Sequence, residues 1–182
     1  ALALAGDGGE YAPEISPAAY SAIDAGSADE LWMVGGLHVT HNEGEAWPAG
    51  EGLVVQRSRS GVVWHRVPAG PLLSVAAVGT GEAWAVGAAG LVVHVRAGQL
   101  TAQRLTSGRW LRDIASGERG ELWIVGDDGT LLHGDGATLV AVTGLPLPPR
   151  PQLVSVEARG QGRAWVASPD GILDVTARGG CP

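Results

Sequence analysis

The sequence predicts an all-β protein built from four copies of one small antiparallel sheet. Glycine accounts for 29 of the 182 residues, as expected of a chain with many tight turns. A tryptophan recurs at positions 32, 84, 123 and 165, each time within a short apolar run. No segment keeps an apolar period of 3.6 residues, and short alternating runs between glycine turns are typical of strands.

The four copies agree at more positions than the tryptophan. Around it they read ELWMVG, EAWAVG, ELWIVG and RAWVAS. Nine residues before each tryptophan stands a β-branched residue, with Tyr or Leu three residues earlier; the pairs are Tyr20 and Ile23, Leu72 and Val75, Leu111 and Ile114, and Leu153 and Val156. Six residues after the last three tryptophans come Gly90, Gly129 and Gly171. This agreement indicates a repeat of roughly 40 residues.

Each copy is expected to hold four strands, which in the second copy are 72–78, 82–87, 90–95 and 100–105. Small four-stranded sheets in tandem cannot bury both faces alone, so they stack around an axis. The sequence therefore predicts one β-propeller domain, with the L-x-x-[IV] run innermost and the tryptophan run second. The expected blades are about 19–70, 71–109, 110–151 and 152–178, with 1–18 as an N-terminal segment.

The ends of the chain suggest how the ring closes. Four blades is the low end of the usual range of about four to eight. After GILDVTA only RGGCP remains, which is too short for an outermost strand. We therefore predict that residues near 10–16 complete the last blade and close the ring. The alternatives are an N-terminal segment that only crosses the surface, a fragment of a larger ring, and half of a dimer.

The repeat resembles a known family of propellers. The pattern W-x-V-G-x-x-G-x-[LV] is similar to the bacterial neuraminidase or Asp-box type of repeat, most of all to that of photosystem II assembly factor-like propellers. Within THNEGEAW, the Asp-box form S/T-x-[DN]-x-G-x-x-W is matched by Thr40, Asn42, Gly44 and Trp47, and RSRSGVVW keeps its second half. The resemblance implies a propeller over about 20–178, but many unrelated functions share such motifs.

Sialidase activity, which an Asp-box suggests, is not expected. The resemblance would require three clustered arginines and a tyrosine nucleophile. The only tyrosines are Tyr11 and Tyr20, and Tyr20 falls at an inner-strand position that we expect in the core. The sequence also shows no nucleophile elbow and no Ser-His-Asp spacing.

Charge and composition limit the partners. The net charge of −7, with no lysine, disfavours nucleic acid, and no apolar run reaches the roughly 20 residues needed to span a membrane. Residues 1–9, ALALAGDGG, fit the end of a cleaved signal peptide or a frayed terminus. The first reading predicts a secreted or periplasmic bacterial protein. The lone Cys181 excludes an internal disulfide or a cysteine-based zinc cluster and leaves an intermolecular disulfide open.

The largest departure from the repeat is an insertion at 36–49. From Trp32 to the next repeat glycine, Gly52, there are twenty residues instead of six, so fourteen have been added. They lie between the second and third strands, on the propeller face that also carries the blade-to-blade connections. Insertions on one face of a repeat array are commonly binding elements. The predicted binding residues here are His38, His41, Asn42, Glu43, Glu45 and Trp47.

Two other readings of the insertion stay open. It is either a structural hairpin or a chelating site, because imidazole and carboxylate groups at short spacing can bind zinc. A strand, however, would send His38 and His41 to opposite faces, so a metal is the less favoured reading.

The repeated tryptophans are expected to fill the space between blades. Trp110 stands outside the repeated position and joins the predicted binding residues. His94 and His133 are equivalent third-strand residues, and His65 is expected to face solvent. Asp127 and Asp128 fit a tight turn rather than catalysis. The run PLPPRP, 146–151, predicts a rigid connection between blades, with a polyproline ligand as the alternative.

These observations favour a non-catalytic protein without a cofactor, which acts as a protein-binding, scaffold or assembly module through one propeller face. A carbohydrate-binding lectin is the main alternative. A metal-dependent hydrolase at the insertion is less favoured.

Overall fold

The computed structural model describes residues 18–37, 50–105 and 108–177. Within these ranges the chain forms fifteen β-strands and three single 3₁₀ turns, and no α-helix. The first sheet holds β1 (Ala18–Ser27), β2 (Glu30–Leu37), β3 (Gly52–Ser58) and β4 (Gly61–Val67). The second holds β5 (Leu72–Gly79), β6 (Glu82–Gly87), β7 (Leu91–Arg96) and β8 (Gln99–Arg104).

The remaining strands form two further sheets. The third sheet holds β9 (Leu111–Ser116), β10 (Leu122–Gly126), β11 (Leu131–Gly134) and β12 (Leu139–Ala141). The fourth holds β13 (Ser155–Gly160), β14 (Arg163–Ser168) and β15 (Gly171–Thr176). In each sheet the strands pair antiparallel in chain order, so every sheet is an up-and-down meander. The prediction of an all-β chain of repeated antiparallel sheets is confirmed.

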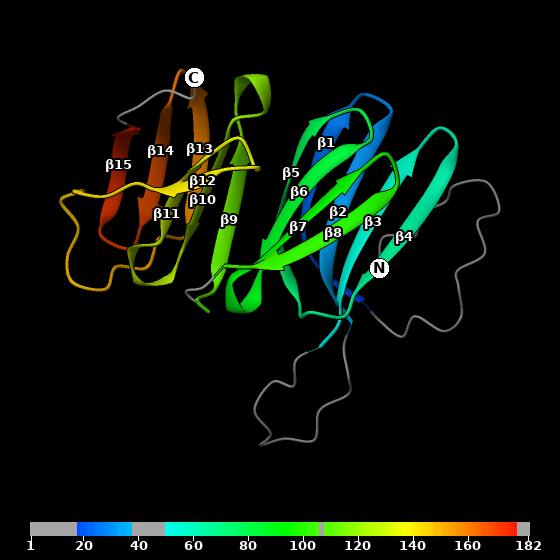
Figure 1. Cartoon of the computed structure of the whole chain (residues 1–182), viewed down its shortest axis with the longest axis horizontal. Helices are drawn as coiled ribbons and strands as arrows, with labels where there is room; N and C mark the ends of the chain where they lie inside the picture. The colour runs from blue at the N-terminus through cyan, green and yellow to red at the C-terminus, as the bar shows by residue number, and fades with distance from the viewer. Residues whose placement is uncertain (1–17, 38–49, 106–107, 178–182) are drawn as a thin grey trace.

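The four sheets, called blades below, lie side by side in chain order, with the first and last at opposite ends of the row (Figure 1). Their first strands pack together: β1 against β5, β5 against β9, and β9 against β13. The second strand of each blade also packs against the first strand of the next, as β2 does against β5. Among the described residues no sheet joins the last blade to the first. The predicted closing strand near 10–16 lies outside the described residues.

The pairing registers explain why tryptophan and the β-branched residue recur together. Trp84 pairs with Ala76, whereas Val75 pairs with Ala85, so the two side chains lie on opposite faces of one blade. Each blade therefore presents its tryptophan to the blade that follows and its β-branched residue to the blade that precedes.

The cores between blades follow this rule. Trp32 and Val75 share one cluster, and Trp123 and Val156 share another, with both tryptophans completely buried. Trp84 is partly buried and packs against the cluster that contains Ile114. A fully buried aromatic side chain contributes on the order of 2–3 kcal/mol through the hydrophobic effect. The repeated tryptophans are thus the packing residues of the three blade junctions.

The two ends of the row depart from the sequence-based expectation. Tyr20, expected in the core, is 44% exposed, and Ile23 is 63% exposed although its equivalents in the other blades are buried. Trp165 is 47% exposed, whereas Trp123 is completely buried. The reason is positional, since among the described residues no sheet precedes the first blade or follows the last. The repeat pattern alone does not carry this information.

His65 also differs from the expectation that it faces solvent. It is only partly exposed, and its Nε2 is buried with no hydrogen-bond partner among the described residues. In the register, His65 pairs with buried Val54, which places it on the face of the first blade that packs against the second. Burial lowers the pKa of this imidazole below its ordinary value.

Candidate functional site

The second-to-third-strand turns and the blade-to-blade connections lie together on one face of the blade row. Backbone hydrogen bonds tie the two together: Ala88 N–H donates to the Pro71 carbonyl over 3.1 Å, and Asp127 N–H donates to the Trp110 carbonyl over 3.0 Å. In the first blade, Gly36 lies against Pro71 of the connection. We call this face the connection face. The sequence analysis places the insertion on it.

The turn GDDG has a structural role on this face. Asp128 adopts a left-handed conformation with φ of 55°, which aspartate tolerates better than most residues, and Gly129 follows at φ of 73°. Its aspartates form ion pairs with Arg112 of β9 and with Arg109 of the connection that precedes β9. The Arg112 Nε lies 2.6 Å from an oxygen of Asp127, and the Arg109 Nε lies 3.1 Å from one of Asp128. These ion pairs agree with a turn rather than a catalytic pair.

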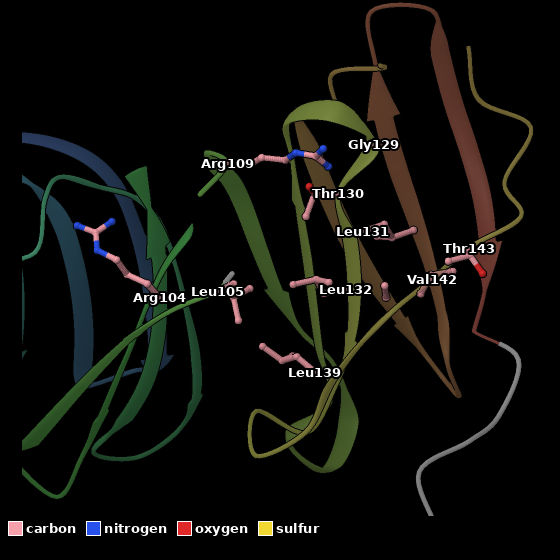
Figure 2. A pocket seen from close by; sticks show the side chains of 11 residues that line it. Arg104, Leu105, Arg109, Gly129, Thr130, Leu131, Leu132, Leu139, Val142 and Thr143 are labelled. Carbon is pink, nitrogen blue, oxygen red and sulfur yellow. The ribbon is translucent and has the colours of Figure 1, made fainter. Parts of the chain in front are cut away.

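A groove of about 520 Å³ runs from the connection face between the second and third blades. Its lining residues are Arg104, Leu105, Arg109, Gly129, Thr130, Leu131, Leu132, Leu139, Ala141, Val142 and Thr143. Figure 2 shows Leu105 on the side of the second blade, facing Leu132 and Leu139 of the third blade, while the Arg104 guanidinium extends away from these leucines. The groove therefore has aliphatic walls contributed by two different blades.

Two arginines are among the residues that line the groove. The Arg104 guanidinium donates to the Ala89 and Ala88 carbonyls over 3.0 and 3.3 Å, and also to the Ala69 carbonyl. Arg109 forms its ion pair with Asp128, and both of those side chains are more than 40% exposed. A guanidinium carries five N–H donors, so each arginine keeps donors beyond these contacts. The arrangement suits an apolar ligand that also carries a carboxylate or carbonyl groups.

The predicted site residues fall into two groups. His38, His41, Asn42, Glu43, Glu45 and Trp47 lie outside the described residues. Trp110 lies in the connection just before β9 and is 40% exposed. It does not line the groove, although its neighbour Arg109 does. The groove itself was not predicted, because its walls come from residues more than 30 positions apart that carry no common motif.

A second cavity, of about 450 Å³, lies along the first strands of all four blades. Its lining includes Asp24, Asp113 and Glu157. The carboxylates of Asp24 and Asp113 accept hydrogen bonds from neighbouring blades. Asp24 accepts a hydrogen bond from Ala77 N–H over 2.8 Å. Asp113 accepts from the Ser74 hydroxyl over 2.6 Å and from the Ser155 hydroxyl over 2.7 Å. These carboxylates therefore join blades.

Histidine and glutamate form a repeated motif beside two of the tryptophans. His94 stacks on Trp84 with ring centroids 3.9 Å apart and contacts Glu82 over 2.8 Å. His133 contacts Glu121 over 2.7 Å, and Trp123 Nε1 donates to the same carboxylate oxygen. The two histidines thus occupy equivalent positions, and each packs against the tryptophan of its own blade. In the described part of the chain no cluster of three or more His, Cys, Asp or Glu side chains suits a metal ion.

Comparisons with known proteins inform the fold. No family model matches the sequence, and no curated protein matches it. A solved structure of YCF48 bound to D1 peptide is similar, with 24% identity and a TM-score of 0.50. The match covers 57% of this chain and 35% of that chain, so this chain accounts for about a third of its neighbour's length. The likeness supports a β-propeller relationship. No helix in the described ranges is long and apolar enough to cross a membrane.

Proposed function

We propose that this chain is a non-catalytic propeller-type binding module that holds an extended segment of a partner protein in the groove between its second and third blades. The observation that carries the proposal is the groove itself, which combines aliphatic walls with two arginines at the connection face. Its volume lies in the range of about 300–1,000 Å³ that is common for ligand sites.

The chemistry of the groove favours a peptide. Leu132, Leu139 and Val142 offer apolar surface for one or two aliphatic side chains. Arg109 can donate to backbone carbonyls or to a carboxylate, and charge-assisted hydrogen bonds are the stronger kind. The YCF48 structure supports the proposal in one respect, since that propeller is bound to a peptide.

The insertion at 36–49 is also part of the proposed binding surface. The strands on either side of it end and begin on the connection face, where Gly36 lies against Pro71 and Gly52 lies against the Gly70 carbonyl. We propose that His38, His41, Asn42, Glu43, Glu45 and Trp47 add contacts to the partner beyond the groove. Trp110→Ala tests the lectin alternative. If the chain is a lectin that uses Trp110, this variant would abolish glycan binding.

The groove is tested with two matched variants of β12. Ala141 is exposed and lines the groove, so Ala141→Trp fills it without removing a core side chain. Val140 is the next residue, is 60% exposed and does not line the groove, so Val140→Trp is the control. The probe is a set of peptides selected on the wild-type protein from a display library of short random sequences.

We expect selected peptides to carry aliphatic residues beside a carboxylate. Ala141→Trp should weaken their binding on the order of a hundredfold, about 2.7 kcal/mol, while Val140→Trp leaves it unchanged. Equal effects of the two variants, or peptides that bind equally well to both, would contradict the proposed site. Circular dichroism of both variants shows whether the fold is retained.

A further inference from the structure

The outer strand of the third blade, β12, has backbone groups that bond to none of the described residues. β12 pairs with β11 alone and forms the edge of its sheet. The Val142 N–H donates to the Leu131 carbonyl over 2.9 Å, so these two residues are a hydrogen-bonded pair. Hydrogen-bonded and non-hydrogen-bonded pairs alternate along an antiparallel ladder. In this register Leu139 and Ala141 belong to non-hydrogen-bonded pairs, so their N–H and C=O groups point away from β11.

These open backbone groups lie at the groove between the second and third blades. Leu139 and Ala141 both line it, and they are two residues apart on one strand. The opposite wall offers less, because the Leu105 N–H is bonded within its own blade and only its neighbour Arg104 is open beside the groove. An added strand needs donors and acceptors at every second residue. The edge that meets this need at the groove is therefore β12.

The edge of β12 also lacks the usual protection against pairing. Proteins commonly guard an edge strand with charged residues or proline. The outer strands β4, β8 and β15 carry Arg66, Arg104 and Asp174. In contrast, the run 138–143, TLVAVT, contains no charged residue and no proline. Because β12 spans only Leu139–Ala141, its edge suits a short segment rather than another whole sheet.

The side chains beside this edge define what an added strand would carry. Ala141 pairs with Leu132, so the side chains of these two residues lie on the same face of the blade. On that face Leu132 and Leu139 meet Leu105 of the second blade (Figure 2). A strand laid along β12 directs every second side chain to the same face. The groove thus accepts two aliphatic side chains separated by one residue that points away.

We propose that the partner segment binds by strand addition, as a fifth strand of the third blade paired with β12. The inference rests on the proposed function, because the same groove holds the segment. It specifies the partner as a short extended segment with aliphatic residues at alternate positions. Backbone hydrogen bonds to Leu139 and Ala141 provide affinity, and the side chains that enter the groove provide specificity.

Methylation of the peptide backbone tests the pairing without altering the protein. The probe is a peptide selected on the wild-type protein, made as a series in which one backbone N–H at a time becomes N–CH₃. Every second N–H of an added strand faces its neighbour, so methylation should weaken binding roughly tenfold at alternate positions and little between them. Equal weakening at all positions, or none at any, would overturn strand addition.

Exchange of single amides, followed by NMR, tests β12 itself. The N–H groups of Leu139 and Ala141 are open in the free protein, and the bound peptide should slow their exchange by roughly tenfold or more. The Val140 N–H is the internal control, because it already faces β11 in a hydrogen-bonded pair with His133. Equal protection of all three amides, or protection of none, would contradict the pairing.

The Ala141→Trp variant separates failure of this inference from failure of the proposed function. A peptide that this variant releases, but that shows no alternation in either test, removes the strand pairing and keeps the groove. A peptide that binds the variant as tightly as the wild type removes both.

Discussion

At the residue scale, the same repeated amino acid has different energetic roles in different blades. Trp123 is completely buried between the third and fourth blades, whereas Trp165 is 47% exposed and has the Arg159 guanidinium 4.1 Å from its ring centroid. Tyr20 and Ile23 show the same effect at the first blade. A side chain's position in the repeat defines where it points, and the neighbouring blade decides whether it is buried.

This difference predicts unequal losses of stability. Trp123→Ala removes a buried aromatic side chain and should lower the free energy of unfolding by about 3–5 kcal/mol. Trp165→Ala should lower it by less than about 1 kcal/mol. Urea unfolding followed by circular dichroism measures both. Equal losses would show that the two tryptophans have equivalent surroundings, against the structure.

His65 predicts a dependence of stability on pH. Burial lowers the pKa of its imidazole in the folded state below the value of about 6.5 in the unfolded state. As the pH falls through about 6.5, the unfolded chain binds a proton at this site that the folded chain does not, so the folded state loses stability. His65→Gln should remove this part of the acid destabilisation. Urea midpoints of both proteins between about pH 7.5 and about pH 5 provide the test, and parallel curves would refute it.

At the element scale, hydrogen bonds between the first strands hold adjacent blades in register. The Asp113 carboxylate on β9 accepts a hydrogen bond from the Ser74 hydroxyl of β5. It also accepts hydrogen bonds from two groups of β13, the Ser155 hydroxyl and, over 2.9 Å, the Val156 N–H. One carboxylate thus links three blades. Its contribution adds to that of the apolar clusters on either side.

Replacing this carboxylate should loosen the last blade. Asp113→Asn leaves one acceptor oxygen for several donors and should cost about 1–3 kcal/mol, because the Val156 N–H or a hydroxyl loses its partner. Amide exchange should accelerate most in β13–β15, because β13 packs on β9 and β10 of the third blade. Asp170→Asn, at an exposed turn of the same blade, is the control. Uniform acceleration across all blades would contradict a local link.

The sequence predicts the strands because the same pattern of residues recurs in each blade. The runs predicted for the second blade coincide with β5 to β8 within one or two residues, and the tryptophan and β-branched positions predict the packing between blades. The groove could not be predicted in this way. Its walls combine Leu105 of one blade with Leu139 of another, and neither belongs to the repeated pattern. Asp113 was also missed, because the equivalent residues Ser74 and Ser155 are not acidic.

At the scale of the whole molecule, the three junctions among the described residues produce a row of blades with a connection face. The connection face carries the groove and the ends of the strands that flank the insertion. The groove belongs to the second and third blades.

The most direct test of the binding function is hydrogen exchange of the wild-type protein with and without a selected peptide. We expect added protection in the described residues that line the groove, at 104–105, 109, 129–132, 139 and 141–143, and little change in β1 to β4. Protection restricted to the first strands of the blades, or to the insertion at 36–49, would place the partner elsewhere and contradict the account.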